Sequence, residues 1–290
     1  MLSVIIFSKD RAMQCDAALC SIYKYFDIDK KISVLWTASN SEYVNGYSRL
    51  IDIHKDNAVF VEESSFLADL LSLLRTALPY TLFFTDDSLV IRPFTYDSVF
   101  KEFETNDQVL GLNLRVGKNI IDNYNLEDLE LDKFFDKSSR IITHLLSVNN
   151  MESIEFTNNM YTWRDKNILT WGYSMAAAGQ IYRTKDLLGE PLSLHKRYIV
   201  NPNTFEDALM AFPLDKKFLI CQDENVIIEV CINEVITTHA GNPHGNISTK
   251  YLNDKWLEGF KIDEECFFQL KGNSKRFLDV ELKFIRIKNA

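Results

Sequence analysis

The sequence lacks the features that mark several large classes of protein. Its five cysteines are odd in number and form no CxxC pair, so neither a disulfide framework nor a zinc ribbon is predicted. A reducing, cytoplasmic compartment is the simplest interpretation of such free cysteines. No apolar run approaches the ~20 residues that a membrane-spanning helix needs. We therefore expect a soluble protein, or at most a peripheral one.

Basic residues are in deficit. The chain of 290 residues has 32 Lys and Arg against 41 Asp and Glu, a formal net charge of −9. Broad nucleic-acid binding needs basic side chains to neutralise phosphates, so the composition argues against a nucleic-acid partner. A small anionic ligand stays open, because a metal ion can supply positive charge locally. Apolar residues make up 46% of the chain, which is typical of a globular protein with a large core.

Common nucleotide-binding and hydrolase motifs are also missing. The chain has no GxGxxG, no HExxH and no GxSxG, which disfavours nicotinamide dehydrogenases, zincins and α/β-hydrolases. The segment 111–118 is similar to a P-loop, but its spacing is one residue too long. Asn119 stands where the P-loop has the Ser or Thr that holds magnesium, so we discard this motif.

The first hundred residues alternate strand and helix patterns. Continuous apolar segments, which indicate strands buried on both faces, occur at 2–7, 32–36, 58–61 and 80–84. The segments between them carry apolar residues at helical spacing, so we expect a doubly wound α/β sheet that is mostly parallel. Ligands of such sheets bind at the carboxyl ends of the strands. The loops expected there are 8–11, 37–40 and 85–88.

The second half is less regular. Further strands are predicted at 108–114, 175–183, 218–221 and 226–232, and a helix over 203–212 with Thr204 as its N-cap. No linker, repeat or low-complexity tract is visible. We therefore predict one domain over residues 1–250, followed by a C-terminal extension over 251–290 that packs on it.

The strongest local signal is the acidic pair Asp86 and Asp87, directly after the apolar strand 80–84. Adjacent carboxylates repel each other unless positive charge lies beside them. Mg²⁺ or Mn²⁺ fits, because these ions take one or two carboxylates together with phosphate oxygens. A β-turn capped by Asp is equally common in proteins. The two residues alone leave both interpretations open.

This arrangement resembles the GT-A glycosyltransferases, over roughly the first 115 residues by order of elements. In that superfamily a DxD-type motif follows a buried strand and binds the diphosphate of a nucleotide-sugar donor through Mn²⁺ or Mg²⁺. Thr85-Asp86-Asp87 matches the looser variant of the motif. The resemblance implies a GT-A (Rossmann-like) fold with a nucleotide-binding half over 1–115 and an acceptor half over 116–250. It makes Asp87 the metal ligand and places Asp86 nearer the donor ribose or sugar.

The resemblance also implies further donor and substrate contacts. Residues placed at the donor are Ser8, Asp10, Arg11, Thr37 and Arg75. The segment Trp171, Gly172 and Tyr173 would line the donor-sugar and acceptor pocket, since aromatic faces suit sugar rings. Ordinary core packing is the alternative for each ring.

Two later spots extend the resemblance. Inverting members place a Glu-Asp pair at the start of a helix under the acceptor, which implies that Asp207 is the base and that Glu206 binds or orients the acceptor. The alternative is that both acids merely favour the helix dipole. A late histidine often reaches the metal or diphosphate, and His239 matches by position, with His244 in reserve. A surface loop is the alternative for both histidines.

The implied function is a metal-dependent glycosyltransferase. It would move a sugar from a nucleotide-diphosphate sugar, with a UDP-sugar favoured, to a glycan or lipid-linked acceptor, with inversion, in bacterial surface polysaccharide or glycoconjugate synthesis. A retaining reaction stays open if Asp207 is not a base. The alternatives are a GT-A-like binding module without catalysis, or a sugar-nucleotide nucleotidyltransferase, although the glycine-rich loop of the latter is missing after the first strand. The basic tail 271–288 is either a solvated face or a peripheral contact with anionic lipid headgroups.

Overall fold

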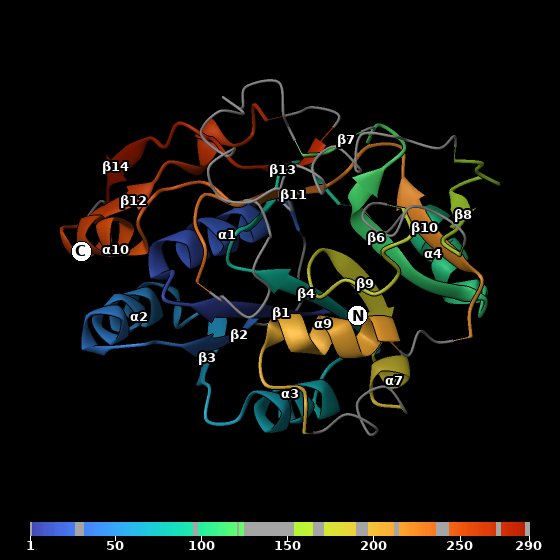
Figure 1. Ribbon diagram of the computed structural model, residues 1–290, viewed down its shortest axis with the longest axis horizontal. Coiled ribbons are helices and arrows are strands. Elements are labelled where there is room, and N and C mark those ends of the chain that lie inside the picture. The colour runs from blue at the N-terminus through green and yellow to red at the C-terminus, as the bar shows by residue number, and fades with distance from the viewer. Residues whose placement is uncertain are drawn as a thin grey trace, which may run out of the picture.

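An eight-stranded sheet forms the centre of the described part of the computed structural model, with the order β3-β2-β1-β4-β9-β6-β10-β8 (Figure 1). The structure describes residues 2–26, 32–94, 98–120, 122–124, 154–164, 171–189, 197–211, 215–235, 244–270 and 274–287. The parallel strands are β1 (Leu2–Lys9), β2 (Ile32–Thr37), β3 (Ala58–Glu62), β4 (Tyr80–Thr85), β6 (Val109–Gly117) and β10 (Phe218–Gln222). Strands β8 (Met160–Thr162) and β9 (Gln180–Arg183) run antiparallel to their neighbours. The predicted mixed, mostly parallel α/β sheet is confirmed.

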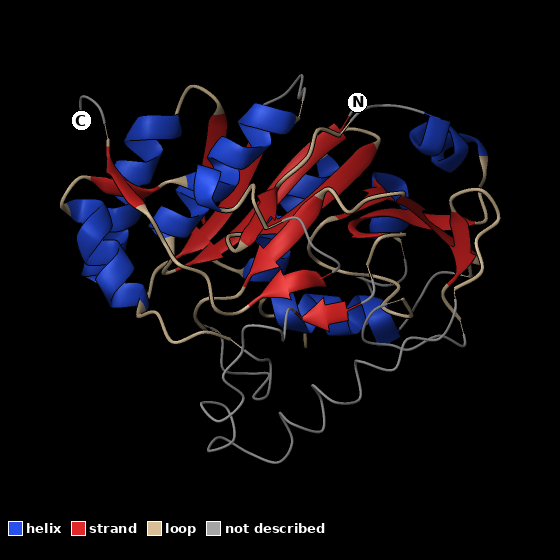
Figure 2. Ribbon diagram, turned by 90° about the horizontal axis from the view of Figure 1, so that it is seen from above, coloured by secondary structure: helices blue, strands red, loops and turns tan. Residues whose placement is uncertain are grey.

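Helices cover both faces of this sheet (Figures 1 and 2). The longer helices are α1 (Ala12–Tyr25), α2 (Ser41–His54), α3 (Phe66–Arg75), α4 (Ser98–Thr105), α9 (Pro202–Ala211) and α10 (Thr249–Leu257). Shorter turns are α7 (Thr184–Leu187) and η1 (Glu264–Cys266). None of the helices in the described ranges is both long and apolar enough to cross a membrane.

Two hydrophobic cores explain why the central strands are apolar throughout. Leu82 and Phe84 of β4 belong to the core under α1, α2 and α10, whereas Phe83 belongs to the core under α3 and α9. Side chains alternate between the faces of a strand, so a strand covered on both sides must be apolar at every position. This is the pattern from which the sequence predicts β1 to β4.

The C-terminal segment contributes strands and a helix that pair or pack with earlier parts of the chain. A second sheet has the order β5-β11-β13-β7, in which β13 (Ser274–Phe277) lies between β11 (Ile227–Val230) and β7 (Asp122–Tyr124), and β5 (Ser88–Val90) forms the edge. A two-stranded sheet joins β12 (Phe260–Ile262) to β14 (Phe284–Arg286). Helix α10 packs on α2, where the Trp256 indole N–H donates to the Gly46 carbonyl at 2.9 Å. Residues after 250 therefore complete both a sheet and a helix layer.

The basic tail is partly turned inward. Lys275 is buried, and Arg276 lines the internal cavity described below. Two of the six basic residues between 271 and 288 thus face the protein interior, which weakens the expectation that this segment rests on lipid headgroups.

We predict that Gly46→Ala destabilises the protein. A methyl group at Gly46 would lie 2.3 Å from Oδ1 of Asn253, whose amide is held by the Glu42 carbonyl at 3.1 Å. An alanine in a helix interior normally gains up to ~1 kcal/mol over glycine, but overpacking here should reverse the sign and cost about 1–3 kcal/mol. Urea unfolding measures this change.

Asn45→Ala, at an exposed position of the same helix, is the matched control and should be close to neutral. If Gly46→Ala were as stable as the wild type, the α2–α10 contact would not be close-packed as described.

Candidate active site

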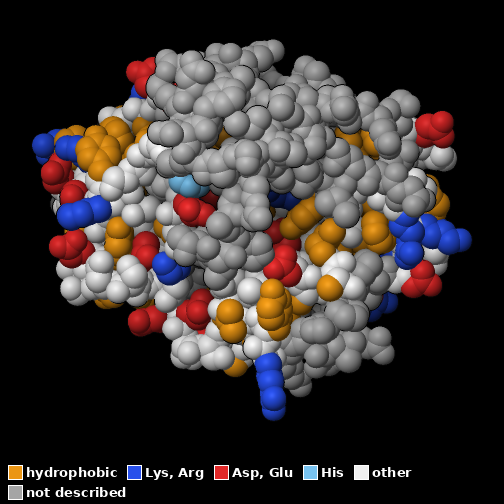
Figure 3. Space-filling model, in the orientation of Figure 1, with side chains coloured by type: hydrophobic (Ala, Val, Ile, Leu, Met, Phe, Trp, Pro, Cys, Tyr) orange, Lys and Arg blue, Asp and Glu red, His pale blue; other side chains and the backbone are white. Residues whose placement is uncertain are grey.

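A cavity of about 550 Å³ opens at the carboxyl ends of β1, β2 and β4. Parallel pairing aligns these ends, since Lys9 pairs with Thr37 and Phe7 with Thr85. The volume falls in the range of ~300–1,000 Å³ that is typical of small-molecule sites. Acidic and apolar side chains are exposed side by side near the middle of the face that Figure 3 shows. The ligand edge predicted from the strand pattern is thus where the structure has its cavity.

The loop after β1 is fixed by Asp10. This residue has a φ of 56°, a left-handed conformation that Asp and Asn tolerate better than most side chains. Its amide donates to the Thr37 carbonyl at 3.2 Å, and its carboxylate accepts from the Ser39 amide at 2.7 Å. Asp10 does not line the cavity. It therefore supports the donor loop, whereas Ser8, Arg11 and Thr37 line the cavity directly.

Asp86 is a buried carboxylate whose oxygens are both engaged. It accepts hydrogen bonds from the Ser8 hydroxyl at 2.9 Å, the Lys9 amide at 3.1 Å and Arg11 Nη1 at 2.9 Å. Burial raises the pKa of Asp86 to about 6, against the opposing effect of the Arg11 guanidinium. The side chain is 4% exposed. Asp86 is therefore a structural partner of Arg11 and leaves little room for a metal ion.

Arg11 joins the two acids. Besides Asp86, its Nη1 donates to Asp87 Oδ2 at 3.2 Å, and its Nη2 donates to the Asn233 carbonyl. The positive charge that the sequence requires beside the adjacent carboxylates is thus supplied in part by the chain itself. The resemblance places Arg11 at the donor nucleotide, and the structure places it at the acidic pair, beside the cavity.

Asp87 is the acid that fits a divalent ion. Its Oδ1 accepts from the Thr85 hydroxyl at 2.6 Å, and its side chain keeps 18% exposure on the cavity wall. A hard cation such as Mg²⁺ or Mn²⁺ needs only one or two protein carboxylates when a diphosphate and water complete its coordination. Each oxygen of Asp87 accepts one hydrogen bond, but the carboxylate is partly exposed to the cavity, whereas that of Asp86 accepts three hydrogen bonds and is 4% exposed. Asp87 therefore meets that requirement better than Asp86 does.

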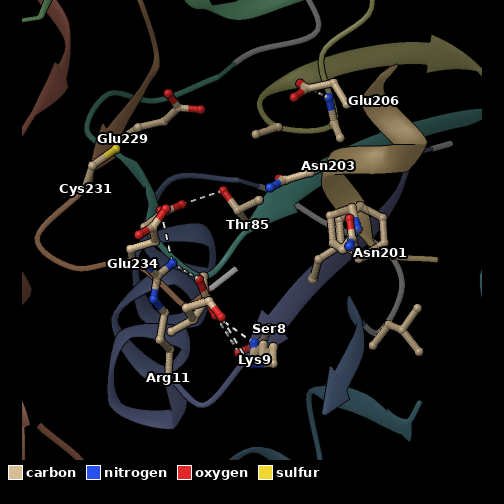
Figure 4. A pocket seen from close by; sticks show the side chains of 18 of the residues that line it. Ser8, Lys9, Arg11, Thr85, Asn201, Asn203, Glu206, Glu229, Cys231 and Glu234 are labelled. Atoms are coloured by element: carbon tan, nitrogen blue, oxygen red, sulfur yellow. Dashed lines mark hydrogen bonds and ion pairs between the residues drawn. The ribbon is translucent and has the colours of Figure 1, made fainter. Parts of the chain in front are cut away.

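A second charged cluster also lines the cavity, and Figure 4 shows its Glu229 beside Cys231. Glu229 on β11 accepts from Arg115 on β6 and from Arg276 on β13. Burial opposes ionisation of Glu229, but the two guanidinium groups outweigh it and hold its pKa well below its usual value. Burial and the same two cations lower the pKa of the neighbouring Lys275.

Gly179 makes room for this cluster. It has a φ of +64°, and a side chain there would lie 2.4 Å from Arg115 Cγ. The sequence analysis missed Arg115, Glu229 and Arg276. The signal for Arg115 and Glu229 is a charged residue inside an otherwise apolar strand, which is unusual unless the charge is paired. Arg276 has no such signal, because its strand is mostly polar.

Glu206 and Asp207 are neighbours in α9, but only one of them lines the cavity. Glu206 lines the cavity and accepts from the Ala177 amide at 2.7 Å, whereas Asp207 does not line it. The expected cap is also displaced, because Asn201 Oδ1 accepts from the Thr204 amide and Thr204 Oγ1 accepts from the Asn201 amide. Asn201 is thus the N-cap, Pro202 takes the first helical position that suits proline, and Thr204 closes the capping box.

The aromatic segment lies under the cavity and not in its wall. Trp171 is buried and makes edge-to-face contacts with Tyr161 at 5.0 Å and Phe156 at 5.5 Å between ring centroids. Burial and the nearby Glu206 carboxylate raise the pKa of Tyr173. Neither ring lines the cavity, and neither does Gly172. The core-packing interpretation therefore fits Trp171 better than a sugar platform.

The remaining predicted residues have mixed outcomes. Arg75 is exposed at the last position of α3, about 15 Å along the helix from its start near the carboxyl edge, and it does not line the cavity. The expected donor contact of Arg75 is therefore corrected. His239 lies outside the described residues. His244, the reserve histidine, lines the cavity with Nε2 at 3.3 Å from Glu234 Oε2.

Comparison with known proteins supports a relationship in sequence. The chain is 26% identical over 223 residues to the bifunctional glycosyltransferase pgtA of Dictyostelium discoideum, which covers 71% of this chain and 27% of that protein. The chain spans about a quarter of the length of this relative. A search against family models finds no match.

Two solved structures have a distantly similar chain course. The mannosyltransferase PcManGT from Pyrobaculum calidifontis, in complex with GDP-Man and Mn²⁺, is 14% identical with a TM-score of 0.41, over 79% of this chain and 56% of that one. TarS 1-349 from S. aureus, in complex with UDP-GlcNAc, is 11% identical with a TM-score of 0.43, over 88% and 70%. These likenesses are distant and assign no role to individual residues of this chain.

We predict that Glu229→Gln destabilises the protein by about 3–5 kcal/mol at pH 7, because it removes the negative charge that pairs with the buried Arg115 and with Arg276. The folded-state pKa of Glu229 lies below its usual value of 4.5, so its ionised form stabilises the fold above that pH. The difference from the wild type should therefore shrink as the pH falls below about 4.5. Urea unfolding at several pH values measures it.

Glu281→Gln changes an exposed acid of the C-terminal segment and should have little effect. A difference between Glu229→Gln and the wild type that stayed constant down to acid pH would contradict the ion-pair origin of the effect.

Proposed function

We propose that the chain transfers a glycosyl group from a nucleotide-diphosphate sugar to a hydroxyl acceptor. The observation that carries this proposal is a single cavity with two acidic walls. Asp87 lines it directly after the end of β4, and Glu206 lines it from α9. Figure 4 shows Glu206 on this helix. The first wall suits a metal–diphosphate, and the second suits an acceptor proton. The sequence relationship to a protein named as a glycosyltransferase supports the same class of reaction.

The donor would lie along the carboxyl ends of β1, β2 and β4. Ser8 and Thr37 offer hydroxyl groups at the nucleotide end, and Leu35 and Phe66 offer apolar surface beside them. Asp87 would hold Mn²⁺ or Mg²⁺, which when bound supplies positive charge for the leaving diphosphate. Arg11 holds Asp87 in place through its contact with Oδ2. A UDP-sugar is the first donor to test, followed by a GDP-sugar.

Glu206 replaces Asp207 as the proposed base. Its Oε1 accepts from the Ala177 amide, and the residue lines the cavity from the middle of α9 (Figure 4). In an inverting transfer the acceptor oxygen forms a bond to the anomeric carbon while the bond to the diphosphate oxygen breaks. The acceptor proton passes to Glu206. A glycan or a lipid-linked sugar would present such a hydroxyl, and the reaction would take place in the cytoplasm or at a membrane surface.

We predict that Asp87→Asn lowers transfer by more than about 100-fold, because the carboxylate that faces the diphosphate loses its charge. The variant should also lose the rise in melting temperature that UDP or GDP produces with Mn²⁺. A ligand at a hundred times its dissociation constant stabilises by about 2.7 kcal/mol, which thermal unfolding detects.

Asp52→Asn, an exposed acid on α2, is the control and should keep both properties. If the nucleotide-dependent shift were the same with chelator as with Mn²⁺, and were unchanged in Asp87→Asn, the metal role of Asp87 would be wrong.

We predict that Glu206→Gln lowers turnover by about 10²–10⁴-fold while donor binding persists, since a general base acts in the chemical step. Asp207→Asn is the matched neighbour and should retain most of the activity. Transfer assays with donor-binding measurements on both variants decide between them. If Asp207→Asn lost activity and Glu206→Gln kept it, Asp207 would be the base. Full activity of both variants would favour a retaining reaction.

A further inference from the structure

A second group of ligand-type side chains lies on α1 and α2, outside the cavity. Asp16 and Cys20 are four residues apart on α1 and therefore share one helix face. His54, the last residue of α2, meets them from the neighbouring helix. One ligand atom of each residue lies within 4.8 Å of the other two. None of the three residues lines the cavity.

The Asp16 carboxylate is incompletely satisfied. Its side chain is 3% exposed, and Oδ1 lies 2.7 Å from Nε2 of His54. The other oxygen, Oδ2, is buried and has no hydrogen-bond partner. A buried carboxylate oxygen without a partner is costly, so this position favours a ligand with positive charge.

We propose that Asp16, Cys20 and His54 bind one Zn²⁺ ion. Carboxylate oxygen, thiolate sulfur and imidazole nitrogen are all zinc ligands, with bond lengths of ~2.0–2.3 Å, and water would complete a tetrahedral set. The mixture of a thiol with an imidazole favours zinc over the Mg²⁺ or Mn²⁺ proposed at Asp87, because those ions prefer oxygen.

Proton balance accompanies binding. The Cys20 thiol releases its proton to solvent, and His54 ligates through Nε2 as the neutral ring with its proton on Nδ1. Burial and Asp16 raise the pKa of the Cys20 thiol to about 12 without metal, so the thiolate forms only as zinc binds. The two anionic ligands then balance the charge of the ion.

The surroundings suit a structural role. Lys261 of β12 lies close enough that Cys20 and Asp16 act to raise its pKa, against the effect of burial. Its ammonium group donates to Glu264 at 3.2 Å. The zinc would therefore join α1 to α2 beside the C-terminal segment. Helix α1 begins directly after Arg11, which pairs with Asp86 and Asp87. A zinc ion on α1 would therefore also stabilise the position of Arg11.

The test uses the full chain, stripped with a chelator and then given one equivalent of ZnCl₂. We expect one zinc per chain after gel filtration and a higher melting temperature than in the stripped protein. With Co²⁺ in place of zinc, a thiolate-to-cobalt absorption band should appear. Cys20→Ser and His54→Gln should each weaken zinc binding by at least about 10–100-fold.

Two controls separate this site from other sources of binding. Cys266→Ser removes a cysteine that is not one of the three proposed ligands, and it should keep the zinc. Asp87→Asn should also keep it, which distinguishes this site from the donor metal. If Cys20→Ser does not fold, the cobalt band of the wild type decides alone. A wild type without stoichiometric zinc and without that band, or triad variants that keep both, would overturn the proposal.

Discussion

The contact of Arg11 with the acidic pair is the interaction on which the cavity depends. Two neighbouring carboxylates at the end of a buried strand cannot both stay ionised in the interior without a cation. Arg11 meets this requirement from the loop after β1, which pairs with β4 in parallel register. The left-handed residue Asp10 then ties the same loop to β2. The ends of β1 and β4 are thus joined by the ion pairs of Arg11, and the end of β2 is joined to them by the hydrogen bonds of Asp10. These contacts make this edge of the sheet a fixed binding surface.

The sequence predicts this edge well because its signals are local. Strands buried on both faces are apolar at every position, and the acidic pair follows one of them directly. The Arg115–Glu229–Arg276 cluster has no such signal, since its members come from β6, β11 and β13, more than a hundred residues apart at the extremes. In the sequence, Arg115 and Glu229 stand out only because each is the single charged residue of an apolar strand. Pairing across a sheet depends on strand order, which periodicity does not determine.

A predicted helix does not determine which of its side chains reach the cavity. The helix expected over 203–212 is observed as Pro202–Ala211, and the acid that lines the cavity is Glu206 and not Asp207. Successive residues on a helix differ by about 100° in direction, so an adjacent acidic pair in the sequence does not show which member lies on the cavity side. The same holds for Arg75. Its helix is predicted correctly, but its position at the end of α3 sets it away from the ligand edge.

The charges of the two walls determine how a donor can enter. At the first wall one guanidinium faces two carboxylates, Asp86 and Asp87, which leaves a net negative charge where the diphosphate would lie. In the second charged cluster, Arg115 and Arg276 are offset by Glu229, with Glu206 nearby. A bare diphosphate would therefore be repelled by Asp87, whereas a diphosphate that carries a divalent ion would be attracted. In the proposed reaction, Arg11 leaves one carboxylate uncompensated, and that remaining charge makes the metal and the donor bind as one unit.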